Sequence, residues 1–242
     1  MTLAGAALAL FAGAALQSAT GFGFALVSAP ILFALLGARE AVTAGVLVAM
    51  LLNLLTLAGE RRRPQVRAGD AAALLAWSLP GLAVGAVALR ALSERLLSGL
   101  VAVAVFAGLA LRVLGRRRAA TARPRAWHLP AAGLAGGALS TSTSLNGPPL
   151  VFCLLARGAS PVQMRDTLAA IFVVQAALGV PALLLSGTFA MPDAVWLLLL
   201  AGVAGQFLGR RAFGRLQGER YERVVLVVLA LTALVALASS LL

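Results

Sequence analysis

Long stretches without a charged residue dominate this chain and leave few folds open to it. Short charged segments separate eight such runs, which cover residues 1–38, 41–59, 71–89, 96–111, 126–156, 167–192, 194–209 and 224–242. A helix needs about 20 apolar residues to cross a hydrocarbon layer of roughly 30 Å. Most of the runs therefore fit one crossing each, and the chain is predicted to be an all-α polytopic membrane protein.

Two of the runs are too long for one crossing. Residues 1–38 are interrupted by Gly21-Phe22-Gly23, and residues 126–156 are interrupted by Asn146-Gly147-Pro148-Pro149. We interpret each run as a broken helical hairpin that enters the membrane and returns, either spanning it fully or as a re-entrant segment. The chain would then have roughly 8 to 10 membrane segments.

The arginines distinguish a hairpin from a single crossing. All twenty basic residues are Arg, and cytoplasmic loops accumulate basic residues. With two hairpins, seventeen Arg share one side and three the other, whereas single crossings divide them ten to ten. The hairpins predict both termini outside the cytoplasm and loops within it at residues 60–70, 112–125, 157–166 and 210–223.

The strong positive charge also has a topological explanation. The formal net charge is +12, but 61% of the residues are hydrophobic, which leaves no soluble domain to present a basic surface. The charge instead orients the chain and meets anionic lipid head groups. We therefore expect the lipid bilayer as a partner and no nucleic acid. The single cysteine, Cys153, offers no metal cluster, so no metal and no cofactor are expected.

An internal repeat supports the hairpins. A shift of 124 residues aligns Ser18 with Ser142, Gly23 with Gly147, Gly81 with Gly205 and Gly85 with Gly209. Each half holds a hairpin and three transmembrane helices, so the second half runs upside down. Such inverted-topology repeats are typical of secondary transporters that hold their substrate near the midplane.

The predicted organisation is one transmembrane domain over residues 1–242. Repeat one covers 1–118, repeat two covers 125–242, and a basic cytoplasmic linker lies at 115–125. The pairs Gly81-x-x-x-Gly85 and Gly205-x-x-x-Gly209 permit close helix packing within one chain or between chains. A homo-oligomer therefore stays open.

Polar residues gather at the two breaks. The candidate substrate-binding residues are Gln17, Ser18, Thr20, Gly21 and Gly23 in the first hairpin, and Ser142, Ser144, Asn146, Gly147 and Pro148 in the second. Pro148 and Pro149 suit the first turn of a helix that Asn146 or Ser144 would cap. Free N–H groups and the positive dipole end at two helix starts would favour an anion. The alternative is that the hydroxyls and glycines only serve helix packing.

Further polar residues could reach the same cavity. Asn53, Gln175 and Gln206 are amides within uncharged runs, and they either line the cavity or bond another helix. Arg165 either begins a helix beside Asp166 or lines a cytoplasmic vestibule that gathers anions. All eight acidic residues lie at the edges of the uncharged runs, which argues against a carboxylate-based cation site.

The hypothesis of an intramembrane serine hydrolase is disfavoured, because the candidate nucleophiles lie too far from a base. Ser140, Ser142 and Ser144 offer nucleophiles, but the only histidine, His128, lies about 18 Å along a helix from Ser140. No catalytic residue is expected.

Three motifs carry a resemblance to a known family. Thr-Gly-Phe-Gly-Phe-Ala-Leu-Val-Ser-Ala-Pro at 20–30, Asn-Gly-Pro-Pro-Leu-Val at 146–151 and Arg-Asp-Thr-Leu at 165–168 resemble the TauE/SafE sulfite exporter family, over essentially the whole chain. The resemblance implies an inner-membrane permease that exports sulfite or related sulfur-containing anions, with the site at residues 18–23 and 142–149. The competing interpretations are a carrier for another small anion, such as sulfate or a carboxylate, and a non-transporting membrane scaffold.

Overall fold

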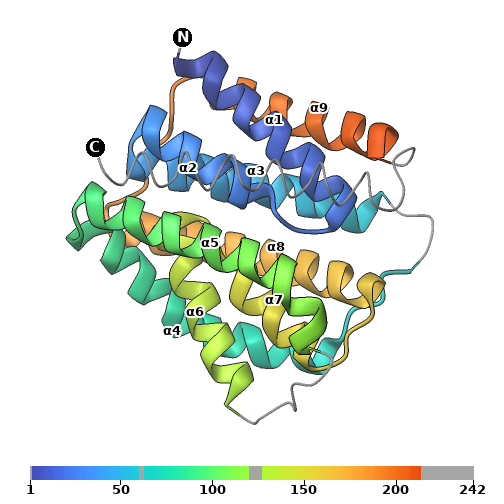
Figure 1. Ribbon diagram of the computed structural model, residues 1–242. Coiled ribbons are helices and arrows are strands. Elements are labelled where there is room, and N and C mark those ends of the chain that lie inside the picture. The colour runs from blue at the N-terminus through green and yellow to red at the C-terminus, as the bar shows by residue number, and fades with distance from the viewer. Residues whose placement is uncertain (1, 60–62, 120–126, 214–242) are drawn as a thin grey trace.

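The computed structural model describes residues 2–59, 63–119 and 127–213, and these residues are all-helical (Figure 1). The helices are α1 (Thr2–Thr20), α2 (Phe24–Leu36), α3 (Ala38–Ala58), α4 (Ala68–Ala91), α5 (Glu94–Ala119), α6 (His128–Thr143), α7 (Gly147–Ala156), α8 (Pro161–Leu185) and α9 (Val195–Phe213). The prediction of an all-α protein is confirmed for this part of the chain. The uncharged run at 224–242, and most of the linker, lie outside the described residues.

Within the described residues, three helices are long and apolar enough to cross a membrane by length and composition: α3, α4 and α8. Shorter apolar helical segments cover Leu3–Ser18, Phe24–Leu36 and Gly147–Ala156. The shorter segments belong to the two runs that we interpret as hairpins.

Both hairpins break at residues with left-handed backbone. Between α1 and α2, Gly21 has φ 79° and Gly23 has φ 105°, which glycine adopts without steric cost. At the second break Ser144 has φ 63°, and α7 begins with prolines in its first turn. Helix α1 packs against α2, and α6 packs against α7. The local sequence therefore fixes where each helix ends.

The helices pack in pairs that join distant parts of the chain. Helix α1 lies along α9, α4 lies along α6, and α3 lies along α8. In Figure 1, α1 and α9 lie side by side at the top, α4, α6 and α7 occupy the lower part, and α3 and α8 lie between them.

The glycine pairs make two of these contacts close. A Cβ atom at Gly81 would collide with the backbone of Leu134, and one at Gly85 would collide with Ala138 on α6. On α9, Cβ atoms at Gly205 and Gly209 would collide with Phe11 and with Ala15 and Ser18 on α1. Both glycine pairs thus serve packing within the chain.

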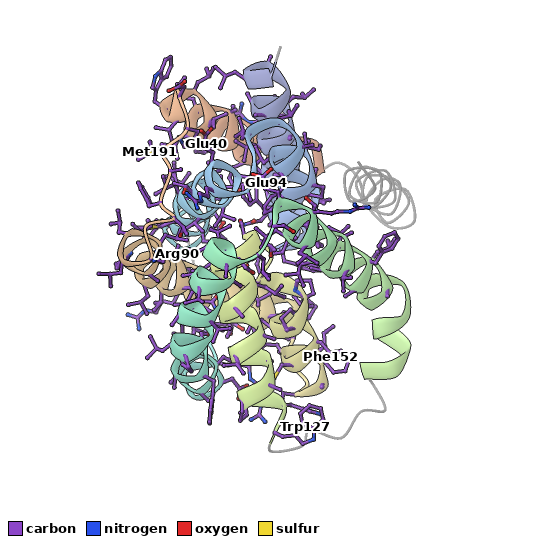
Figure 2. The ribbon with its side chains drawn as sticks, turned by 90° about the vertical axis from the view of Figure 1, so that its left-hand side faces the viewer. Glu40, Arg90, Glu94, Trp127, Phe152 and Met191 are labelled. Atoms are coloured by element: carbon purple, nitrogen blue, oxygen red, sulfur yellow. The ribbon has the colours of Figure 1, made fainter. Side chains whose placement is uncertain are left out.

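Several turns gather at one end of the molecule. Figure 2 looks at this end, where Glu40, Arg90, Glu94 and Met191 lie. Arg90 donates a hydrogen bond to the carbonyl of Ser186 at 3.5 Å. The hairpin topology predicts that residues 39–40, 90–95 and 193 share the outer side. Figure 2 labels Glu40, Arg90 and Glu94 in the upper and middle part of the view, apart from Trp127 and Phe152 at the bottom.

A cluster of ion pairs joins the α3–α4 loop and the start of α4 to the end of α7. Asp70 is bound by Arg67 Nε at 2.7 Å and by Arg157 Nε at 2.8 Å. The N–H of Gln65 donates to Asp166 at 2.7 Å, and the N–H of Arg67 donates to Thr167 at 3.0 Å. These bonds fix the α3–α4 loop to the start of α8. We name Arg67, Asp70 and Arg157 the loop clamp.

Removing the charge at the centre of the loop clamp should destabilise the fold. The side chain of Asp70 is 8% exposed, whereas both arginine side chains are 28% exposed and remain partly hydrated. Asp70→Asn should therefore lower the free energy of unfolding by about 1–3 kcal/mol, measured as a lower melting temperature in detergent. Asp193→Asn, at an exposed position, is the control, and equal melting temperatures for the two variants would contradict the prediction.

Candidate functional site

A hollow lies between the two hairpin breaks. It contains about 380 Å³ of unoccupied space, part of it open to the outside. Its walls come from α1, α2, α3, the α6–α7 break and α8. The lining residues are Gln17, Phe22, Gly23, Phe24, Ala25, Leu26, Ala49, Asn53, Leu145, Asn146, Gly147, Pro148 and Phe172.

The hollow collects six of the residues that the sequence singled out: Gln17, Gly23, Asn53, Asn146, Gly147 and Pro148. They come from both breaks and from α3, so the fold brings together segments more than a hundred residues apart. A Cβ atom at Gly147 would meet no atom within 4 Å, which shows that this break borders open space. None of the lining residues is charged.

Asn146 is held by a chain of hydrogen bonds. Its Nδ2 donates to Gln175 Oε1 at 2.7 Å, and Gln175 Nε2 donates to Ser78 Oγ at 2.8 Å. The Ser78 hydroxyl in turn donates to the carbonyl of Leu74 at 2.7 Å. Gln175 is fully buried, so this chain fixes the amide of Asn146. Its second N–H and its Oδ1 are not used by the residues that the structure describes.

The prediction that Asn146 or Ser144 caps α7 is wrong. Asn146 stands at the N-cap position but makes no capping bond. The reason is that a cap accepts from the N–H groups of the second and third helical residues, and these are Pro148 and Pro149, which have none. Ser144 instead ends α6 in a left-handed conformation.

The two helix starts offer different donors. The first turn of α2 has no side-chain cap, and its residues Phe24, Ala25 and Leu26 all line the hollow. The first three residues of α7 include two prolines, so Gly147 is the only one of the three with a backbone N–H. Both dipoles keep their positive ends at the breaks, but most backbone donors belong to α2.

A second pair of amides also lines the hollow. Gln17 Nε2 donates to Asn53 Oδ1 at 3.1 Å, and Asn53 Nδ2 donates to the carbonyl of Ala49 at 2.7 Å. Both side chains are buried. This pair connects α1 to α3 beside the hollow.

The remaining candidates lie outside the lining. Ser18 and Ser142 donate to carbonyls of their own helices, those of Ala15 and Ala138, as the packing alternative expects. Ser144 packs against Gly45 of α3. The side chain of Thr20 lies outside the described residues.

The other candidates divide between support and packing. Gln175 accepts the hydrogen bond from Asn146 and does not itself line the hollow. Gly21 packs against the side chain of Arg165. Gln206 bonds Thr56 Oγ1 of α3 at 2.9 Å. It therefore serves contact between α9 and α3.

His128 lies at the start of α6, beside aromatic rings. Its ring centroid is 4.5 Å from that of Trp127 and 6.5 Å from that of Phe152. Figure 2 labels these two aromatic residues. Because α6 continues without a break to Thr143, Ser140 lies about 18 Å further along the helix.

Some lining residues were not foreseen from the sequence. Phe172 of α8 and Leu145 of the second break add apolar surface to the hollow, and Ser78 of α4 ends the amide chain. An apolar residue inside an apolar helix carries no signal that separates a cavity wall from a lipid contact. Ser78 carries one weak signal, a hydroxyl in the middle of a long uncharged run.

The fold and the hollow define the class: a multi-pass helical membrane protein whose broken helices meet at an uncharged hollow lined by apolar residues and three amide side chains. The family model described as sulfite exporter TauE/SafE matches residues 5–236. The chain belongs to this family, so the resemblance seen in the motifs is confirmed and the protein is of the transporter type. Comparisons with curated proteins and with solved structures found no match.

Proposed function

We propose that the protein is a secondary transporter that exports a small anion, sulfite or an organosulfonate, through the hollow between the two hairpin breaks. The observation that supports this most is the chemistry of the lining. The start of α2, whose first N–H groups have no acceptor within the helix, lines the hollow together with the amide-bearing residues Gln17 and Asn146, and the lining holds no carboxylate. Such donors stabilise an oxyanion without binding a cation.

The packing supports alternating access around this hollow. Under the shift of 124 residues, the contact between α1 and α9 corresponds to that between α6 and α4, while α3 meets its counterpart α8. This is the pattern expected of two inverted repeats with a site on their pseudo-two-fold axis. The glycine contacts join α1 to α9 and α4 to α6, and each of these pairs combines one helix from each repeat. If each pair moves as a rigid unit during alternating access, each unit would contain helices of both repeats.

The orientation follows from the arginines. The loop clamp and the arginines near the ends of α5 and α9 would face the cytoplasm of the cell, with the protein in its inner membrane. Both termini would then lie outside the cytoplasm. Export in this orientation begins at the end of the hollow nearest these arginines.

Flux measurements test the function directly. Purified protein in proteoliposomes should take up labelled sulfite with saturable kinetics above empty liposomes, and sulfoacetate or taurine should compete. Stronger competition by sulfate or acetate would assign the carrier to those anions instead. Absence of flux of any of these anions, from protein shown to be folded, would contradict the proposal and favour a scaffold.

A further inference from the structure

Helices α3 and α8 are each bound near their start by the loop that follows the other helix. The N–H of Arg67, in the loop after α3, donates to Thr167 Oγ1 of α8 at 3.0 Å. The N–H of Ala190, in the loop after α8, donates to Thr43 Oγ1 of α3 at 3.2 Å. Both hydroxyls are buried. We name the contact of Arg67 with Thr167 the first latch and that of Ala190 with Thr43 the second latch.

The two latches lie at opposite ends of the same pair of helices. Figure 1 shows the teal α3–α4 loop at the right-hand ends of α3 and α8, and the orange α8–α9 loop at their left-hand ends. Under the shift of 124 residues, Thr43 aligns with Thr167, and Ala190 aligns with the residue before Arg67. Equivalent contacts at both ends indicate a role that both ends share.

The hollow lies between the two latches. Ala49 and Asn53 of α3 line it, and both lie between the second latch and the end of α3. Phe172 of α8 also lines it, between the first latch and the end of α8. Separation of α3 from α8 at one end would therefore open the hollow towards that side, while the latch at the other end keeps it closed.

Charged groups reinforce the first latch. The loop clamp lies beside it, and Asp166 Oδ2 accepts the N–H of Gln65 at 2.7 Å. Under the shift of 124 residues Asp166 aligns with Val42, so the second latch lacks this carboxylate. Beside the second latch, Arg90 reaches the carbonyl of Ser186 at 3.5 Å, which is longer than the usual range of about 2.7–3.2 Å. Within the described residues, the first latch is therefore the tighter of the two.

We propose that the two latches are the gates of the transporter. Release of the first latch opens the hollow to the cytoplasm, and release of the second opens it to the outside. This inference rests on the proposed function, which makes the hollow the transport site, and on the topology that assigns the loop at 60–70 to the cytoplasm. Because the first latch is tighter, the empty protein should open more often to the outside, where an exporter must release its anion.

The test measures how fast a thiol in the hollow is labelled from each side of the membrane. Cys153 is the only cysteine and is buried, so Cys153→Ala removes the background. Gly147→Cys then places one thiol in the hollow, where an added Cβ meets no atom within 4 Å. A membrane-impermeant methanethiosulfonate is added to inside-out vesicles, which expose the cytoplasmic face, or to right-side-out vesicles, which expose the outer face.

In this background Thr167→Val should raise the labelling rate about three- to tenfold in inside-out vesicles only, and Thr43→Val should do so in right-side-out vesicles only. Valine offers no acceptor, and the loss of one hydrogen bond shifts an equilibrium by about this factor. Thr143→Val is the matched control with an unchanged rate on both sides, because its buried hydroxyl donates to the carbonyl of Leu139 of its own helix at 2.9 Å. Unchanged labelling in both latch variants would overturn the inference.

The structural alternative is that both threonines only stabilise the fold. That role predicts a lower melting temperature for each variant and equal changes in labelling from both sides, and this result would overturn the inference. Should Thr167→Val fail to fold, Asp70→Asn decides, because it weakens the loop clamp beside the first latch. It should accelerate labelling in inside-out vesicles only, and unchanged or two-sided labelling would count against the gates.

The failure of this inference is distinct from the failure of the proposed function, because labelling does not require sulfite to move. Saturable sulfite flux by the wild type, with unchanged labelling in both latch variants, leaves the exporter in place and removes the gates. One-sided changes in labelling, in a protein that moves no sulfite, keep the gates and remove sulfite export.

Discussion

Replacing Asn146 by aspartate should abolish sulfite transport while leaving the protein folded. Aspartate has nearly the same shape, so it can keep the contact with Gln175 if that amide turns its Nε2 toward the new carboxylate. A carboxylate here would face the bound anion across an otherwise uncharged hollow. At an effective dielectric constant of about 20, two unit charges about 4 Å apart repel each other by about 4 kcal/mol. That is roughly a thousandfold loss of affinity, and the initial rate of sulfite uptake should fall to that of empty liposomes.

The control for this substitution adds the same charge outside the hollow. Gln163→Glu replaces an amide in the capping box at the start of α8, where its Oε1 accepts the N–H of Ser160 at 3.2 Å. Glutamate can keep this bond, so transport should be unchanged. Normal transport by Asn146→Asp would show that the anion does not pass beside Asn146, and it would remove this residue from the site.

Replacing Gly85 by leucine should prevent α4 and α6 from packing. The new Cβ alone would collide with the carbonyl oxygen of Ala138 and the hydroxyl of Thr141. Thr141 also donates to the carbonyl of Leu82 at 2.7 Å, so the substitution breaks a buried hydrogen bond as it separates the helices. Overpacking typically lowers the free energy of unfolding by about 1–3 kcal/mol, and by more where the backbone must move. For Gly85→Leu we expect a decrease at or above the top of that range.

The yield of monodisperse protein and its melting temperature in detergent measure this effect. Gly99→Leu is the control, because an added Cβ at this glycine of α5 meets no atom within 4 Å. Unaltered stability of Gly85→Leu would contradict the close contact between α4 and α6.

The ends of the broken helices were predictable from the sequence because their causes are local. Gly21 and Gly23 permit positive φ, and Pro148 and Pro149 can only begin a helix, so α1, α2, α6 and α7 end and begin near the predicted residues. The clustering of polar residues at the breaks likewise indicates Gln17 and Asn146 as candidate site residues, and both line the hollow. Inverted repeats and the placement of the termini stay predictions.

The pairing of side chains was not predictable, since it depends on which face of each helix points inward. In a soluble protein that face is apolar and the outer face polar, but these helices are apolar on both faces. Nothing in the sequence therefore indicated that Gln175 would hold Asn146, or that Phe172 would line the hollow. The capping role assigned to Asn146 failed for a local reason that the sequence does contain, because both residues whose N–H a cap would bind are prolines.

The packing of α1 on α9 has a consequence for biosynthesis. Helix α1 leaves the ribosome well before α9, its glycine-lined partner, which begins only at Val195. At translation rates of about 5–20 residues per second, α1 waits roughly 10–40 s for this contact. During that time its surface at Phe11, Ala15 and Ser18 is open to lipid, to a chaperone or to the insertion machinery. Nascent chains cut short before α9 should therefore be degraded quickly, even though they contain both hairpin breaks.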